Sequence, residues 1–335
     1  MKLIKPSTEL ISWADNDPLQ VIERIGRTCY KSEDKITETS APAFVQRIIK
    51  QGHLAVLDHW NLVFSVTPSI ATLVEKCLTN VFDSMWCSRY FRITRDTRCL
   101  VSTNMRSVIE LAHSGHEMLG KIFVGHLKEF YPDVFVDIDV PQSLSVPVRD
   151  ILLLKTAAKL TAFEQMIHEV VSVRFIIDRG VSHELVRHRP VAYCQESTRY
   201  CNYGNQEHMT FIIPPWMINV SPMIHKTGDS TPYLLIDEAR WFWHMKDCEH
   251  KYRQFLELGW SPQKARSVLP NSLKTEVVAT ATMQEWKHIF SQRCAKNAHP
   301  QMQEVMIPLR DKFQVLYPKF LSGSVNTGKK TDDLR

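Results

Sequence analysis

The amino-acid sequence predicts a protein of mixed helix and sheet, in the α/β (α+β) class. Runs such as "WNLVFSV" and "EVVSVRFII" are apolar and rich in β-branched residues, which is typical of buried strands. Segments such as "EARWFWHMKDCEHKYRQFLELGW" carry apolar residues at helical spacing. The chain has 335 residues, which is enough for one large domain or two ordinary ones.

The N-terminal part predicts a helix, a strand and then a less regular region. "SAPAFVQRIIKQGH" predicts a helix that Ser40 caps and Gly52 ends, and "WNLVFSV" predicts the strand after it. Beyond it, "MWCSRYFRIT" suggests a strand, "MRSVIELAHSGHEMLGKIFVGHLKEFY" one or two helices, and "DVPQSLSVPVRD" a loop. We interpret residues 67–167 as an insertion or subdomain, and the polar residues 321–335 as a flexible tail.

Regular patterning resumes in the C-terminal half. After the strand "EVVSVRFII", we predict a short helix "SHELVRH" with Ser182 as its cap and Pro190 as its stop, and then a strand "MTFIIPPWMINV" interrupted by two prolines. "SPQKARSVLP" predicts a compact helix with Ser261 as its cap and Pro262 at its first position. "SLKTEVVATATMQEWKHIFSQRC" is expected to form one long helix, followed by a helical region in "AKNAHPQMQEVMIPLRDKFQVL".

Composition narrows the class of protein. Hydrophobic residues make up 44% and charged residues 23%, as in ordinary globular proteins. The formal net charge is +5, which suits small anionic ligands better than a nucleic-acid-coating surface. The eight cysteines have no CxxC or zinc-finger spacing, which predicts isolated thiols in a reducing compartment. Without a signal-peptide pattern or a membrane-length apolar run, we expect a cytoplasmic protein.

The one dense cationic cluster lies in "VRHRPVAYCQESTRY". Arg187, His188 and Arg189 are adjacent, and Ser197 and Arg199 follow. Arginine binds phosphate or carboxylate through a planar fork, so an anion site is one interpretation. The other is a surface patch of salt bridges, whose partners would be Glu184, Glu196 and Asp178. The like charge of its neighbours should disfavour protonation of His188.

Two further arginines raise the same choice. Arg293 follows Trp286 by seven residues, so a helix would place its cation on an apolar face. Such a cation must pair with a core carboxylate, extend to solvent or reach a ligand oxygen. Arg266 in "KARSVLP" has the same alternatives.

Metal and nucleotide-binding motifs are missing from the sequence. His53, Asp58 and His59 form a small polar cluster, but their spacing matches no metal-ligand pattern, so a self-satisfied turn is the simpler interpretation and we predict no metal site. There is neither a GxGxxG motif after a strand nor a GxxxxGK[ST] motif.

The order of several motifs resembles the flavin-dependent thymidylate synthases. "RHR", seven residues, and then "STRY" is similar to that family's signature. "GHLAVLDH" resembles its GHxSxxEH segment, "ARSVLP" its ARxxLP turn, and "TEVVATATMQEWKHIFSQRCAKNAHPQMQE" its C-terminal helix and tail. The resemblance covers residues 1–66 and 168–320, which we interpret as the catalytic domain.

This resemblance implies a fold and an activity. The fold would be a central mixed or antiparallel sheet flanked by long helices, in a homotetramer with shared active sites. The reaction would be reductive methylation of dUMP to dTMP. Methylenetetrahydrofolate would supply the carbon, and FAD reduced by NADPH the hydride. No membrane or nucleic-acid partner is expected.

The resemblance also assigns residues. Arg293 and His53 would be catalytic: Arg293 would stabilise negative charge on the uracil as N3 ionises, and His53 would lie near the flavin ring and the folate. Ser197 has no evident base and is a poor candidate nucleophile. The dUMP would contact Glu184, Arg187, Gln195, Ser197, Thr198, Arg199, Arg266 and Arg293. The FAD would contact His53, Ala55, Asp58, Arg187, His188, Arg189, Gln195, Thr282, Gln284 and His288.

Several positions depart from the family pattern. Thr282 and Gln284 stand where the family often has Asn-x-Arg, and Ala55, Asp58 and Glu184 replace a small hydroxyl residue, a glutamate and a glutamine. The insertion contains an Asn-x-Arg at residues 104–106, and one hypothesis is that it substitutes for the missing motif. Two alternative functions therefore stay open: a dUMP hydroxymethylase or related pyrimidine-modifying enzyme, and a non-enzymatic nucleotide- or RNA-binding protein.

Overall fold

A computed structural model describes most of the chain. It covers residues 1–11, 13, 17–79, 90–113, 117–141, 150–154, 160–226, 228–230 and 232–318. The predicted tail at 321–335 lies outside these residues, as do residues 85–89 of "MWCSRYFRIT" and most of "DVPQSLSVPVRD".

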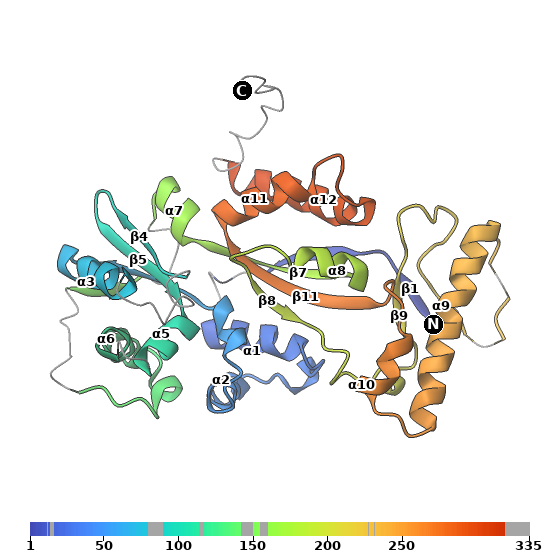
Figure 1. Cartoon of the computed structure of the whole chain (residues 1–335), viewed down its shortest axis with the longest axis horizontal. Coiled ribbons are helices and arrows are strands. Elements are labelled where there is room, and N and C mark those ends of the chain that lie inside the picture. The colour runs from blue at the N-terminus through green and yellow to red at the C-terminus, as the bar shows by residue number, and fades with distance from the viewer. Residues whose placement is uncertain are drawn as a thin grey trace, which may run out of the picture.

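A four-stranded antiparallel sheet occupies the middle of the molecule (Figure 1). Its strands, in spatial order, are β2 (Ser7–Ile11), β7 (Val170–Asp178), β11 (Lys274–Thr282) and β8 (Ala192–Gln195). The two long central strands, β7 and β11, pair over nine residues. Their register places residues that are about 100 positions apart in the sequence opposite one another. This arrangement confirms the expected central antiparallel sheet.

Helices cover both faces of this sheet (Figure 1). The helices α11 (Met283–Arg293) and α12 (Pro300–Leu316) lie on one face, while α1 (Pro18–Thr28) and α2 (Ser40–Lys50) lie on the other side. Trp286 of α11 is fully buried and stacks on Phe175 of β7, with ring centroids 6.3 Å apart. Burial on both faces explains why the long strands have nearly continuous apolar runs.

The prediction of one long helix ending near Cys294 was wrong in its first half. Residues 274–282 form strand β11, and only the second half is helical. Val277, Val278 and the threonines beside them are β-branched and pack well on a sheet. The Thr282 hydroxyl accepts a hydrogen bond from the Glu285 backbone N–H at 3.1 Å, so it caps the helix where the strand ends.

Two predicted helix caps were also misplaced. Helix α8 (Arg179–Leu185) begins earlier than predicted, because Asp178 accepts from the Val181 N–H at 2.6 Å and is its cap. Ser182 lies inside that helix. Ser40 is the first residue of α2 rather than its cap, and its hydroxyl accepts from the Thr37 N–H at 2.9 Å.

The residues that we predicted to be an insertion, 67–167, pack against the N-terminal segment. Strand β3 (Asn61–Val66), predicted as "WNLVFSV", is the third strand of a sheet whose other strands are β4 (Arg92–Arg95), β5 (Cys99–Asn104) and β6 (Ile151–Leu153). The helices of this region are α3 (Pro68–Thr79), α5 (Met105–Ala112), α6 (Glu117–Lys128) and α7 (Ala162–His168). Phe64 of β3 packs on Phe123 of α6 with centroids 4.9 Å apart, so the two segments share one core.

A third layer lies at the opposite end of the central sheet (Figure 1). It contains β10 (Met223–Ile224), β1 (Lys2–Ile4) and β9 (Thr210–Ile212), with α9 (Ile236–Glu257) and α10 (Pro262–Ala265) beside them. The predicted helices in "EARWFW…" and "SPQKA…" are thus present. In the described ranges, no helix combines the length and apolarity that crossing a bilayer requires.

A buried ion-pair network on the central sheet should dominate acid stability. The carboxylate of Glu276 accepts from Lys274 at 2.8 Å and from Arg174 Nε at 3.0 Å, and it also pairs with Lys31. Burial alone would raise the pKa of Glu276, but the lysines lower it to about 2. We expect Glu276→Gln to lower the free energy of unfolding at pH 7 by about 2 kcal/mol.

The pH dependence follows from the sign of this shift. Because the folded pKa of Glu276 lies below the ordinary 4.5, its stabilisation is present above pH 4.5 and is lost as the pH falls towards 2. Urea unfolding from pH 2 to 7 should show a shallower acid loss in Glu276→Gln than in the wild type. Glu75→Gln, which removes one end of an exposed pair with Arg95, is the control. Equal losses in the two variants would contradict the assignment.

Candidate functional site

A cavity of about 550 Å³ lies between the central sheet, the start of α11 and the insertion; we call it the sheet cavity. Five of the predicted FAD residues line it: Asp58, Arg189, Thr282, Gln284 and His288. Thr282 ends β11 and caps α11, which is why Gln284 and His288, on the first turns of the helix, lie beside it. A cavity of this size can hold a large part of a nucleotide cofactor.

Arg293 is held by two residues, Glu184 and His188, which accept three hydrogen bonds from it. Its Nε donates to His188 Nε2 at 2.8 Å, its Nη1 to the Glu184 carboxylate at 2.7 Å, and its Nη2 to the Glu184 backbone oxygen at 2.9 Å. Of the alternatives raised by the sequence, pairing with a carboxylate is therefore the one seen. Three of its five N–H groups are used in these bonds, so two are left for a ligand.

His188 is a neutral ring. Burial, together with Arg293 and His288, lowers its pKa to about 4. The direction agrees with the sequence-based expectation, but the cause is burial and Arg293 rather than the two adjacent arginines. Because Arg293 can only donate, Nε2 of His188 accepts, and the proton of the neutral ring is on Nδ1.

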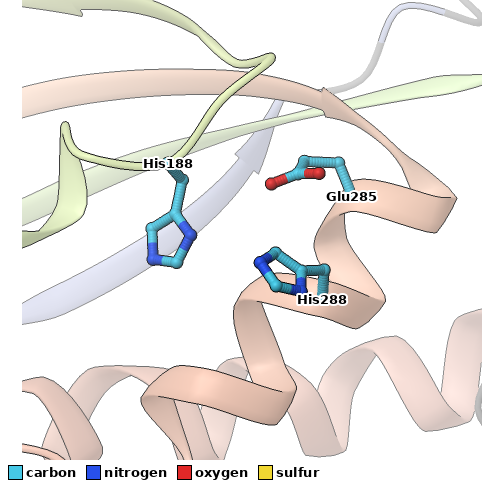
Figure 2. Close-up of side chains that lie close together, drawn as sticks. All are labelled: His188, Glu285 and His288. Atoms are coloured by element: carbon cyan, nitrogen blue, oxygen red, sulfur yellow. The ribbon is translucent and has the colours of Figure 1, made fainter.

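His188 also belongs to a cluster with Glu285 and His288 (Figure 2). One potential ligand atom from each lies within 4.8 Å of the others. Figure 2 shows the His188 and His288 rings and the Glu285 carboxylate turned towards a common space. One nitrogen of His188 is occupied by Arg293 and the other is protonated, so the ring has no lone pair free for a metal while that contact persists. The cluster is better described as a group of polar side chains in which one carboxylate oxygen of Glu285 is buried without a hydrogen-bond partner among the described residues.

Metal removal should therefore have no effect. We expect the purified protein to contain no stoichiometric metal, and EDTA treatment to leave its melting temperature unchanged, as measured by metal analysis and thermal unfolding. Arg293→Met is an informative comparison, because removing the arginine frees Nε2 of His188 and should increase zinc binding at the cluster. A stoichiometric metal in the purified wild type that EDTA removes would show this interpretation to be wrong.

Three of the predicted dUMP-binding residues form a loop after β8, which we call the serine loop (residues 197–199). The Ser197 backbone N–H donates to the Cys29 carbonyl at 3.0 Å, which fixes the loop after β8. Arg266 donates to the Thr198 hydroxyl at 3.2 Å, and Arg199 is exposed with its guanidinium 5.4 Å from the Tyr200 ring centroid. The structure thus brings Ser197, Thr198, Arg199 and Arg266 together.

The surface salt-bridge interpretation of the cationic segment was wrong. Glu184 pairs with Arg293, Glu196 pairs with Lys274 at 2.8 Å, and Asp178 caps α8. Within the described residues, no carboxylate forms a salt bridge with the remaining arginines of this region, namely Arg187, Arg189, Arg199 and Arg266. Four uncompensated cations are the charge pattern that an anionic ligand requires.

His53 lies in a different cavity. This cavity, of about 430 Å³, is lined by His53, Ala55, Cys29 and Tyr30, among others; we call it the His53 cavity. Tyr30 connects it to the serine loop: its hydroxyl is 3.5 Å from His53 Nδ1, and its ring centroid is 5.3 Å from that of Tyr200. Seven of the predicted FAD residues are thus divided between two cavities of one chain, five in the sheet cavity and two, His53 and Ala55, in the His53 cavity.

The remaining predicted residues have definite places. Gln195 donates to the hydroxyls of Ser182 at 3.0 Å and Thr275 at 3.3 Å, within the fold, whereas Arg187 is exposed. His59 is fully buried against Thr280 at 2.7 Å, and burial lowers its pKa to about 3, so it is a core residue.

The carboxylate of Asp58 pairs with Arg106, a residue of the predicted insertion. Burial raises its pKa to about 6, although Arg106 lies 3.2 Å from its carboxylate and lowers it. Arg106 also donates to Glu110 at 2.6 Å, so two carboxylates already neutralise its charge. This does not favour the hypothesis that residues 104–106 substitute for the missing Asn-x-Arg motif. Sequence reasoning missed Glu285 and Arg92, which also line the sheet cavity.

Comparison with known proteins identifies the family. A family model described as thymidylate synthase complementing protein matches residues 9–77 and 153–319. Flavin-dependent thymidylate synthase from Corynebacterium glutamicum is 28% identical over 148 residues, which are 42% of this chain and 56% of that protein. The protein of the same name from Pyrococcus horikoshii is 30% identical over 128 residues, which are 38% of this chain and 47% of that protein.

One solved structure aligns over most of the chain. It is the UMP/dUMP methylase PolB from Streptomyces cacaoi bound with 5-Br dUMP, at 13% identity and a TM-score of 0.38, covering 96% of this chain and 93% of that one. The chain spans about half the length of the curated relatives it matches. The family model matches most of the central sheet, the serine loop and the larger part of the lining of both cavities, but not residues 78–152. The chain therefore belongs to the thymidylate synthase complementing protein family.

Proposed function

We propose that this protein catalyses the reductive methylation of dUMP to dTMP, with methylenetetrahydrofolate as carbon donor, NADPH as reductant and FAD as cofactor. The observation that carries the proposal is the group of four arginines without carboxylate partners among the described residues, in a chain of this family. The curated relatives carry the name flavin-dependent thymidylate synthase.

The serine loop is the proposed phosphate site of dUMP. Arg199 and Arg266 supply charge, and the hydroxyls of Ser197 and Thr198 supply neutral donors. Arg293 is the proposed partner of the uracil edge. Its two unused N–H groups would stabilise the negative charge that develops as N3 loses its proton and C5 becomes nucleophilic.

The sheet cavity is the proposed FAD site. Arg189, Thr282, Gln284 and His288 line it, and the neutral ring of His188 offers a donor close by. When bound, FAD supplies the hydride that completes the methyl group. The residues present fit an anionic dinucleotide, because the exposed cation of Arg189 has no carboxylate partner in the part of the chain that the structure describes.

A homotetramer with shared active sites would reconcile the separate cavities. His53 is proposed to lie near the flavin ring and folate, yet it lines a different cavity of the same chain from His288. Contact between the His53 cavity of one copy and the sheet cavity of another would complete the site. The departures Glu184, Ala55 and Gln284 fall at this proposed site and are the positions at which specificity would differ within the family.

The first test is spectroscopic. Purified protein is expected to be yellow with bound flavin, and its bound flavin should be reduced by NADPH faster when dUMP is present. Deoxyuridine, which differs from dUMP only in lacking the phosphate, is the matched control and should give little acceleration. Colourless protein that takes up no added FAD, and whose RNA affinity falls steeply with salt, would instead support a nucleic-acid-binding function.

A further inference from the structure

Arg92 is a cation that the insertion places in the sheet cavity. It lies on the edge strand β4 and lines the cavity together with Arg189 and His288. The family model matches residues up to 77 and again from 153, so Arg92 belongs to a part of the chain that the family pattern does not include. The family match therefore assigns no role to Arg92.

The contacts of Arg92 are with neutral groups. Its Nη2 donates to Asn61 Oδ1 at 2.6 Å and its Nε to the Ser102 hydroxyl at 3.0 Å. Ser102 in turn contacts Nδ1 of His168 at 2.8 Å, and burial and the charge of Arg92 lower the pKa of His168 to about 4, so this ring is neutral as well. These bonds fix the orientation of the guanidinium without neutralising it.

No carboxylate compensates this charge among the described residues. Burial lowers the pKa of Arg92 to about 10, which still leaves it protonated at pH 7, and no nearby acid raises it again. The cavity has two acids, but Asp58 is bonded to Arg106 and Asn104, and Glu285 lies in the cluster with His188 and His288. A desolvated cation without an anion is costly, so an anionic ligand is the group that would stabilise it.

The free N–H groups of Arg92 suit a phosphate. Two of its five N–H groups are used, so three remain for a ligand. Arginine forks bind phosphate oxygens in bidentate fashion, and Arg189 adds a second uncompensated cation to the same cavity. Gln284, which also lines the cavity, is neutral, so α11 provides no cation at that position.

We infer that Arg92 binds a phosphate group of the cofactor in the sheet cavity, so that the insertion supplies part of the cofactor site. This inference rests on the proposed function in naming the ligand as the pyrophosphate of FAD. The experiment measures equilibrium binding to flavin-free full-length protein, for wild type, Arg92→Met and Arg92→Lys. Arg95→Met, on the same strand but exposed and paired with Glu75, is the control. The probes are FAD, riboflavin, NADPH and inorganic pyrophosphate.

The expected result separates a ligand contact from a structural role. Arg92→Met should weaken FAD and pyrophosphate binding by about 10- to 100-fold and leave riboflavin binding unchanged, with Arg92→Lys intermediate and Arg95→Met like the wild type. The melting temperature of unliganded Arg92→Met should equal or exceed that of the wild type, because an unpaired charge is removed. Loss confined to NADPH would overturn the assignment to FAD.

Two other results would overturn the inference. One is FAD affinity within twofold of wild type in Arg92→Met. The other is an equal loss of FAD and riboflavin binding with a lower melting temperature, which would make Arg92 a structural residue. If the wild type binds no flavin, the proposed function fails. Pyrophosphate binding then tests the phosphate site by itself. Weaker pyrophosphate binding in Arg92→Met than in the wild type would support a phosphate site at Arg92, and equal binding would overturn it.

Discussion

Arg293→Ala is expected to lower kcat/KM for dUMP methylation by roughly 10²–10³-fold while FAD remains bound. The guanidinium is fixed by His188 at 2.8 Å and by Glu184 at 2.7 Å, and it keeps only 18% of its side chain exposed. A cation held in place and partly screened from water stabilises a developing anion better than a mobile one does. Steady-state kinetics and flavin absorbance of the same preparation measure the two quantities.

The controls separate charge from geometry. Arg293→Lys keeps the charge but cannot bond to His188 and both Glu184 oxygens together, so it should recover only part of the rate. Arg310→Ala removes a half-buried arginine of α12 that pairs with Asp311, and it should behave like the wild type. Near-normal turnover in Arg293→Ala, or a loss of flavin in proportion to the loss of rate, would refute its role at the uracil.

The second large effect is expected at the serine loop. Arg199→Ala should raise the KM for dUMP about 10- to 100-fold with a much smaller change in kcat, because a charge-assisted phosphate contact is removed. Arg199 is exposed and contacts Tyr200 rather than a carboxylate, so its removal leaves no buried acid unpaired. Fold stability should therefore be within about 0.5 kcal/mol of the wild type.

Deoxyuridine gives this prediction an internal control. It differs from dUMP only in lacking the phosphate, so Arg199→Ala should reduce the wild-type preference for dUMP while leaving the activity with deoxyuridine unchanged. Arg266→Ala should have a smaller effect of the same kind, since Arg266 donates to Thr198 at 3.2 Å and acts partly through the loop. An unchanged dUMP affinity in both variants would exclude the serine loop as the phosphate site.

Local patterns predicted the parts of the fold that depend on local chemistry. The run "EVVSVRFII" is strand β7, and the helical spacing in "EARWFWHMKDCEHKYRQFLELGW" is helix α9. The prediction of a helix at residues 274–282 was wrong because Thr282 both ends a strand and caps a helix. The helical pattern begins only after Thr282, whereas the prediction started the helix before it. Pairing with β7 over nine residues agrees with the preference of the β-branched residues in this segment for a sheet.

The site was predicted in part for a similar reason. Ser197, Thr198 and Arg199 are close in sequence, and their loop is built as expected, with Arg266 beside it. Pairings across the fold were not predictable: Glu184 with Arg293, and Glu196 with Lys274, depend on which elements pack together. Arg92 was missed because its significance lies in lacking a carboxylate partner, which only the fold reveals.

The most direct test of the proposed function is the mass of the product of an anaerobic reaction with dUMP, methylenetetrahydrofolate and NADPH. We expect a nucleotide that has gained one CH₂ relative to dUMP, formed in proportion to the NADPH consumed. Omitting either methylenetetrahydrofolate or NADPH should prevent its formation. A product that has gained CH₂O, formed without consumption of NADPH, would show hydroxymethylation and contradict the proposed reductive methylation, and so would recovery of unchanged dUMP from flavin-loaded protein.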